Sequence, residues 1–151
     1  MSAETDLIKL YSERILGLAA DIPRLGRLEC PDASVKRRSP LCGSTITVDL
    51  TLDTEGRIAD FAQDVKACAL GQASASVVGG HVIGRNRAEL ETARDQLKAM
   101  LKEECAVPDA PFDGLEVLLP ARDYKNRHAS IMLALEATAE AMAKAEQAAT
   151  A

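Results

Sequence analysis

The chain has 151 residues and a formal net charge of −5, and its composition is 47% hydrophobic and 3% aromatic. This length is sufficient for one domain with its own core, and we expect a single domain over residues 1–151. An acidic chain with two Phe, two Tyr and no Trp lacks the basic surface and the stacking rings that nucleic-acid binding requires. No apolar run approaches the about 20 residues of a membrane span, and the acidic start MSAETDLIKL does not resemble a targeting peptide, so we expect a cytoplasmic protein.

The first half of the chain is predicted to contain one helix and a small antiparallel sheet. Apolar residues recur at helical spacing over residues 6–22, which predicts an amphipathic helix. A short edge strand is expected at residues 34–37. Residues 44–53 alternate between apolar and polar side chains, as a half-buried strand does, and residues 57–65 follow a turn as its hairpin partner.

The second half is predicted to be mainly helical. A run of small residues at 69–80 is expected to form a helix, and Asn86 with Glu89 forms an N-cap pair for a second, amphipathic helix. Residues 122–147 are expected to form a long C-terminal helix whose last dozen residues fray. Together these elements predict an α+β domain, in which about three antiparallel strands carry helices mainly on one face.

Two cysteines flank the predicted hairpin. Cys42 precedes its first strand and Cys68 follows its second, so both should lie at the open end of the sheet. Cys68 also heads the small-residue helix, where the helix dipole favours a thiolate. Two thiols placed in this way suggest a metal or sulfur site, whereas a pair of buried core cysteines is the alternative. The spacing alone does not separate these two hypotheses.

The stretch KACALGQASASVVGG, residues 66–80, is composed almost entirely of small residues behind Cys68. Small side chains allow a helix to lie close against a sheet, which is a purely structural use. They also leave room around the thiol for an inorganic guest or for the loop of a partner. Both interpretations are consistent with the sequence.

Four stretches of the chain resemble the NifU/IscU/SufU scaffolds on which iron–sulfur clusters are assembled. In that family one cysteine lies in a Cys-Gly-Asp motif before a strand, and a second heads a helix of the Cys-x-x-x-x-Ala-Ser-x-Ser type. Cys42 and Cys68 match these two motifs, and the resemblance implies a SufE/NifU-like fold. The matching stretches extend from about Leu7 to Ala139: LYSERILGLAADIPRLGRL, LCGSTITVDLTLDTEGRIADF, VKACALGQASASVV and PARDYKNRHASIMLALEA.

The sequence departs from the family pattern at two positions. Ser44 stands where the family has aspartate, and His128 stands where the family has a third cysteine near the start of the last helix. The resemblance therefore implies Cys42, Cys68 and His128 as metal ligands, with Ser44 as a doubtful fourth. Two thiolates and an imidazole suit zinc, and mixed Cys/His ligation of a [2Fe–2S] cluster also occurs. The other two cysteines match no ligand motif and are expected to be ordinary thiols: Cys30 and Cys105.

The resemblance implies a non-enzymatic scaffold or carrier for iron or a [2Fe–2S] cluster, with a cysteine desulfurase and acceptor apo-proteins as partners. One alternative is a zinc-holding partner of a desulfurase, in which Cys42 or Cys68 accepts persulfide sulfur. Another is a metal-free binding module that retains the shape of the scaffold. A basic cluster before the histidine could attract an anionic cluster or an acidic partner surface: Arg122, Lys125 and Arg127.

Overall fold

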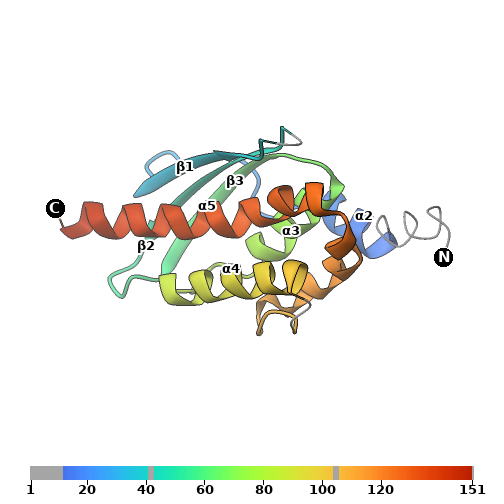
Figure 1. The fold of residues 1–151 in the computed structure, drawn as a ribbon. Helices are drawn as coiled ribbons and strands as arrows, with labels where there is room; N and C mark the ends of the chain where they lie inside the picture. The colour runs from blue at the N-terminus through green and yellow to red at the C-terminus, as the bar shows by residue number, and fades with distance from the viewer. Residues whose placement is uncertain (1–11, 41–42, 104–105, 151) are drawn as a thin grey trace.

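A three-stranded antiparallel sheet with helices on one face forms the frame of the protein (Figure 1). The computed structural model describes residues 12–40, 43–103 and 106–150. No helix among them is long and apolar enough to cross a membrane. In chain order the elements are α2 (Glu13–Ala20), β1 (Ala33–Arg38), β2 (Thr45–Leu52), β3 (Ile58–Lys66), α3 (Ala69–Gly79), α4 (Arg87–Lys102), the 3-10 helix η1 (Phe112–Asp123) and α5 (Lys125–Thr150).

The sheet has the strand order β1-β2-β3, and both pairings are antiparallel, so the predicted hairpin and edge strand are confirmed. In the tight turn between β2 and β3, the Asp53 carboxylate accepts hydrogen bonds from the N–H groups of Glu55 and Arg57. Gly56 adopts a φ of 81° there, a conformation that favours glycine. The end of β1, the start of β2 and the end of β3 lie at the opposite end of the sheet from this turn (Figure 1).

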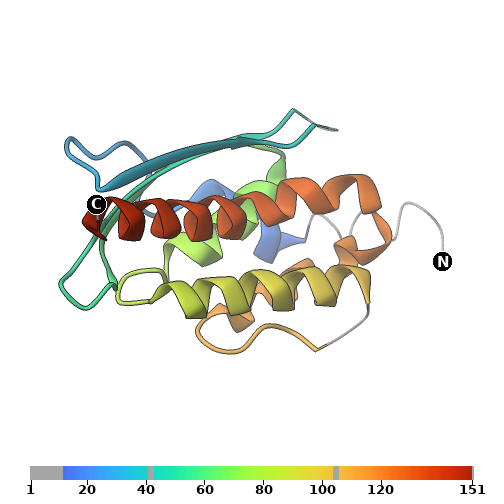
Figure 2. The same cartoon turned by 60° about the vertical axis from the view of Figure 1, so that its left-hand side comes forward.

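Helices α3 and α5 pack against the sheet, and α4 packs against α5 from the far side (Figure 2). The sheet contributes an apolar face to this layer, including the fully buried Val48 and Leu50 of β2. The predicted α+β class, with helices mainly on one face, is therefore confirmed. The first turns of α5 lie at the same end of the sheet as the start of α3 (Figure 1).

The small residues of α3 allow this close packing. A Cβ atom added to Gly71 would lie 2.5 Å from the Ser130 hydroxyl oxygen on α5, and one added to Gly79 would collide with the Gln63 side chain on β3. The Ser74 hydroxyl donates a hydrogen bond of 2.7 Å to the Ile131 carbonyl oxygen, which fixes α3 against α5. The structural interpretation of the small-residue run is thus supported by direct contacts.

The predicted N-terminus of the second amphipathic helix is confirmed as a capping box. The Asn86 side chain accepts a hydrogen bond of 2.9 Å from the Glu89 N–H, and the Glu89 carboxylate accepts one of 3.1 Å from the Asn86 N–H. These bonds satisfy backbone donors that the first turn of a helix leaves free. Helix α4 begins at the following residue, Arg87.

Two helix boundaries differ from the prediction. The first amphipathic helix begins at Glu13, because Ser12 is extended and its hydroxyl accepts a hydrogen bond from the Ile15 N–H. The earlier part of the expected helix lies outside the described residues. The C-terminal helix begins at Lys125 rather than at residue 122, because the preceding segment forms the 3-10 helix η1.

Helix α5 continues to Thr150, and the expected fraying of its last dozen residues stays a prediction. Its last turns are held by contacts that the Ala-rich sequence did not reveal. Met142 and Ala145 are buried, and Glu146 forms an ion pair of 3.2 Å with Arg87 on α4. Tertiary packing therefore holds the C-terminal part of α5 in place.

The outer face of the sheet contains one buried carboxylate, Asp49 of β2. Arg27 donates to it at 2.6 Å and 3.2 Å, and the Leu28 N–H and the Ser34 hydroxyl donate as well. Burial alone would raise the pKa of this carboxyl. The hydrogen bonds and the positive charge of Arg27 outweigh burial, so the pKa of Asp49 is held below its usual value.

Candidate metal centre

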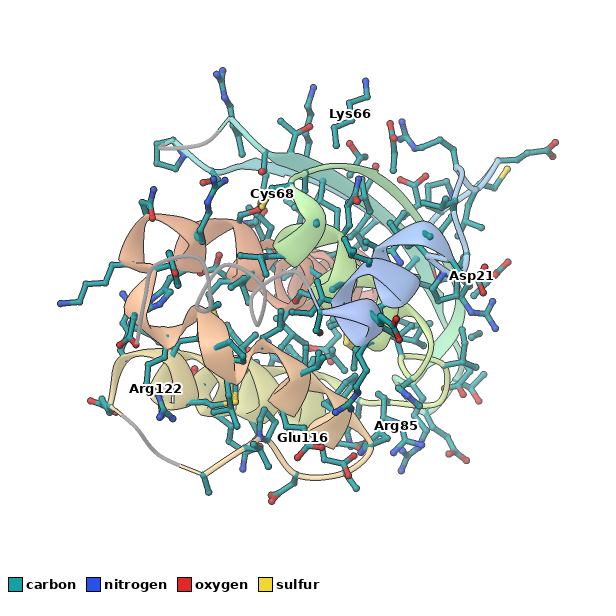
Figure 3. All side chains as sticks on the ribbon, turned by 90° about the vertical axis from the view of Figure 1, so that its right-hand side faces the viewer. Asp21, Lys66, Cys68, Arg85, Glu116 and Arg122 are labelled. Atoms are coloured by element: carbon teal, nitrogen blue, oxygen red, sulfur yellow. The ribbon has the colours of Figure 1, made fainter. Side chains whose placement is uncertain are left out.

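Cys68 lies at the N-terminal end of α3, as the sequence predicts. It is the N-cap residue, with extended backbone angles of −67° and 169°, and its side chain is half-buried. The Cys68 carbonyl oxygen accepts the first hydrogen bond of the helix, from the Gln72 N–H at 2.9 Å. Figure 3 shows Cys68 toward the upper side of the view, near Lys66, with Arg122 toward the lower side.

Two hydroxyl groups form a hydrogen-bonded chain beneath the thiol. The Cys68 sulfur lies 3.6 Å from the Ser130 hydroxyl oxygen, and the Ser130 hydroxyl donates a hydrogen bond of 3.0 Å to the Ser44 hydroxyl oxygen. Ser130 and Ser44 are 1% and 4% exposed. Three segments far apart in the sequence therefore meet here: the residues before β2, the start of α3 and the first turns of α5.

Ser130 was not among the predicted site residues. The available signal was a hydroxyl within the apolar run ASIMLAL of α5. A buried hydroxyl needs a hydrogen-bond partner, so its position implied a polar neighbour across the helix interface. The sequence did not show that this neighbour includes Cys68.

The predicted partner of Cys68 lies outside the described residues. Cys42 is not described, but Gly43 and Ser44 are, and the next residue, Thr45, pairs with Lys66 in the sheet. Within the described ranges, no group of three or more His, Cys, Asp and Glu side chains could hold a metal ion. The meeting of Cys42 with Cys68 stays a prediction.

His128 is buried at the start of α5, with 4% of its surface exposed. Its Nε2 atom lies 3.0 Å from the Ala121 carbonyl oxygen and 2.9 Å from that of Arg122. Carbonyl oxygens only accept hydrogen bonds, so Nε2 carries the proton and Nδ1 is the ring atom with a lone pair for a metal. The α5 side chain that hydrogen-bonds with the Cys68 sulfur is that of Ser130. Ligation of a metal by His128 stays a prediction.

Two members of the predicted basic cluster, Arg122 and Lys125, line a hollow at the start of α5. The hollow has a volume of about 390 Å³. The Arg122 Nε donates a hydrogen bond of 2.9 Å to the Met100 carbonyl oxygen, which ties the end of η1 to α4. The residues that line the hollow are Leu101, Lys102, Arg122, Asp123, Lys125 and His128.

Positive side chains also flank the Cys68 end of the sheet on its outer face. Arg38, Thr45 and Lys66 are aligned across the three strands, and both basic side chains are exposed. Cys30 is the other cysteine among the described residues, and it does not lie at this end. Cys30 is exposed in the loop before β1, and Cys105 lies outside the described residues.

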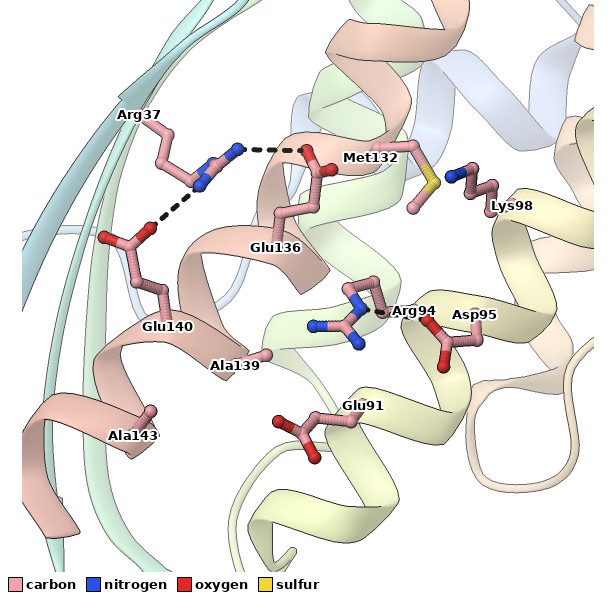
Figure 4. Close-up of a pocket in the computed structure, with 10 residues that line it drawn as sticks. All are labelled: Arg37, Glu91, Arg94, Asp95, Lys98, Met132, Glu136, Ala139, Glu140 and Ala143. Carbon is pink, nitrogen blue, oxygen red and sulfur yellow. Dashed lines mark hydrogen bonds and ion pairs between the residues drawn. The ribbon is translucent and has the colours of Figure 1, made fainter.

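A second hollow, of about 510 Å³, lies between α4 and α5 (Figure 4). Its charges are of both signs and partly neutralise one another. Arg37 reaches Glu140 at 2.8 Å and Glu136 at 3.9 Å, and Arg94 pairs with Asp95 at 3.1 Å. No thiol or imidazole is among the residues that line it, so the Cys68 end of the sheet is the better candidate for metal or sulfur chemistry.

Comparisons with known proteins agree with this architecture. The model of the NifU-like N-terminal domain matches residues 10–147. A crystal structure of a nitrogen-fixing NifU-like protein (N-terminal) from Brucella abortus is 44% identical, covers 94% of this chain and 98% of its own, and superposes with a TM-score of 0.90. No curated protein sequence matches the chain.

A more distant structure shares the fold. It is a putative iron–sulfur cluster assembly scaffold protein for the SUF system from Fervidobacterium islandicum AW-1, at 20% identity and a TM-score of 0.79. The match covers 89% of this chain and 98% of that one. Because the family model spans nearly the whole chain and the Brucella protein shares 44% of its residues, the chain belongs to the family of NifU-like N-terminal domains.

Proposed function

We propose that this protein is a non-enzymatic scaffold or carrier in iron–sulfur cluster assembly, with iron or a [2Fe–2S] cluster as its cargo. The observation that carries the proposal is the half-buried thiol of Cys68 at the N-terminal end of α3, in a chain of the NifU-like family. Half-burial keeps the sulfur reachable from solvent.

The proposed ligands are the thiolates of Cys42 and Cys68, with a further group from the first turns of α5. The family resemblance implies that this group is the imidazole of His128. It would bind the metal through Nδ1, because Nε2 faces the carbonyl oxygens of Ala121 and Arg122. Sulfur and nitrogen ligands suit both zinc and iron. Ser44 is a poorer ligand than a carboxylate, so we expect an open coordination position.

The proposed partners are a cysteine desulfurase, as the source of sulfur, and acceptor apo-proteins, as the recipients of the cluster. Both must reach the Cys68 end of the sheet. The exposed Arg38 and Lys66 on the outer face there would attract acidic surfaces of such partners. The chain as a whole is acidic, with a formal net charge of −5, so this local positive charge distinguishes that end of the sheet.

Metal and sulfide analysis of protein purified without oxygen tests the proposal. Iron together with acid-labile sulfide supports a cluster scaffold or carrier. Zinc alone favours the sulfur-transfer alternative, and protein without metal favours a binding module.

Cysteine variants then locate the site. Cys42→Ala and Cys68→Ala should each lose most of the bound metal, because each removes a thiolate ligand. Cys30→Ala is the matched control, since that thiol is exposed in a loop, and Cys105→Ala is expected to retain metal as well. Loss of metal from the Cys30 variant with retention in the Cys42 variant would contradict the proposed ligand set.

A further inference from the structure

Ser130 is the α5 side chain that contacts the Cys68 thiol. Its hydroxyl oxygen lies 3.6 Å from the Cys68 sulfur. In a tetrahedral site with metal–sulfur bonds of about 2.3 Å, neighbouring ligand atoms lie roughly 3.6–3.8 Å apart. The Ser130 oxygen therefore stands about as far from the Cys68 sulfur as another ligand of the same metal would stand.

The position of the Ser130 hydroxyl is fixed by packing. Gly71 faces it across the α3–α5 interface, and the hydrogen bond from Ser74 to the Ile131 carbonyl holds the two helices in register. Ser130 is 1% exposed and donates to Ser44, so it has little freedom to turn away. The contact with Cys68 thus follows from the interface between the helices.

His128 and Ser130 point in different directions. Residues two apart on a helix do not share a face, so the side that presents Ser130 to Cys68 turns His128 elsewhere. The ring of His128 is bound to the carbonyl oxygens of Ala121 and Arg122 at the end of η1. These contacts give His128 a structural role as a link between η1 and α5.

We infer that Ser130, and not His128, is the α5 side chain of the site, and that it positions the Cys68 sulfur for metal binding. The inference rests on the proposed scaffold function, removes His128 from the ligand set proposed above, and leaves Cys42 and Cys68 as the protein's thiolate ligands. A hydroxyl has one proton and can donate one hydrogen bond, and in this structure Ser130 donates its hydrogen bond to the Ser44 hydroxyl oxygen. When Cys68 binds a metal, its thiol proton is released to solvent, and the Ser130 hydroxyl keeps its own proton but rotates from Ser44 to donate a hydrogen bond to the thiolate. Hydrogen bonds of this kind orient a metal ligand and strengthen its binding.

Cobalt(II) is a suitable probe, because the intensity of its thiolate-to-metal charge-transfer absorption rises with the number of bound thiolates. In Ser130→Cys the new sulfur lies next to Cys68, so the cobalt protein should gain the absorption of one additional thiolate. In His128→Cys the new thiol faces η1, and the spectrum should equal that of the parent. A gain in the His128 variant with none in the Ser130 variant would overturn the inference.

A second pair of variants measures the effect of the hydroxyl. Ser130→Ala should weaken cobalt and zinc binding by about tenfold or more, as loss of an outer-shell partner does. Thr138→Ala is the matched control, because its buried hydroxyl lies on the same helix but donates only to the Ala134 carbonyl at 2.7 Å. Thermal unfolding of each variant shows whether it is folded.

These experiments distinguish a failure of the role of Ser130 from a failure of the proposed scaffold function. Equal metal affinities of Ser130→Ala and the parent overturn the role of Ser130, even if Cys68→Ala abolishes binding and the scaffold function stands. If the parent protein binds neither cobalt nor zinc and gains no metal on reconstitution, the proposed function fails and the role of Ser130 fails with it.

Discussion

Replacement of Gly71 by alanine tests whether the small residues of α3 are required for packing. The added Cβ would lie 2.5 Å from the Ser130 hydroxyl oxygen, 2.9 Å from the Ala67 Cβ and 3.2 Å from the Ser130 carbonyl oxygen. Contacts this short require a shift of α3 or α5, and such overpacking costs about 1–3 kcal/mol. Alanine regains up to about 1 kcal/mol of helix propensity. Because the added Cβ makes three such contacts, the cost lies in the upper part of this range, at about 2–3 kcal/mol, and we expect a net loss of about 1–2 kcal/mol in the free energy of unfolding.

Urea unfolding followed by circular dichroism measures this loss, and the midpoint of thermal unfolding should fall by about 2–4 °C per kcal/mol. Gly17→Ala is the matched control, because Gly17 lies in α2, is exposed and has no atom within 4 Å of its added Cβ. That variant should be more stable than the parent by up to about 1 kcal/mol. A Gly71→Ala protein as stable as the parent would refute the requirement for glycine at this interface.

A double variant tests whether the Cβ added at position 71 clashes mainly with the Ser130 hydroxyl or with the Ser130 backbone. In Gly71→Ala/Ser130→Ala the shortest contact is removed, so the cost should be smaller than the sum of the two single losses. Gly71→Ala alone should also weaken metal binding, because it displaces the hydroxyl from Cys68. An additive double variant would place the strain at Ala67 or at the Ser130 backbone instead.

Two further predictions concern the two faces of the sheet. Because the pKa of Asp49 is lowered in the folded protein, its stabilising effect is complete above the unfolded value of about 4 and is lost as the pH falls toward the folded value. Asp49→Asn should therefore reduce stability at pH 7 but much less at pH 3, which urea titrations at both pH values measure; an equal loss at both would contradict the role of its charge. Ser44→Asp restores a carboxylate at the site and should tighten zinc binding in competition with a chelator, and an unchanged affinity would exclude this position from the coordination sphere.

The elements that could be predicted from the sequence are those with local signals. Alternating side chains fixed the strand pair of the hairpin, and Asn86 with Glu89 marked the start of α4, because capping is decided within one turn. The placement of Cys68 at the head of α3 followed in the same way. Each of these features depends on residues that are close together in the chain.

The features that could not be predicted depend on contacts between distant segments. The burial of Asp49 requires Arg27 and Leu28 to fold over the outer face of the sheet, and nothing in the alternation of β2 indicates such a cover. The contact between Ser130 and Cys68 depends on the register of α5 against α3. Helical periodicity shows that a residue faces inward, but it does not show which residue of a neighbouring helix it meets.

The packing that the small residues of α3 allow also determines which side chain lies beneath Cys68. Gly71 allows α5 to approach α3 closely, and the side chain that this approach brings beneath Cys68 is Ser130. A larger residue at position 71 would separate the helices and remove the hydroxyl from the sulfur. The residues around the thiol are therefore determined by the packing of the two helices, and a change in that packing should alter metal binding even when every ligand is retained.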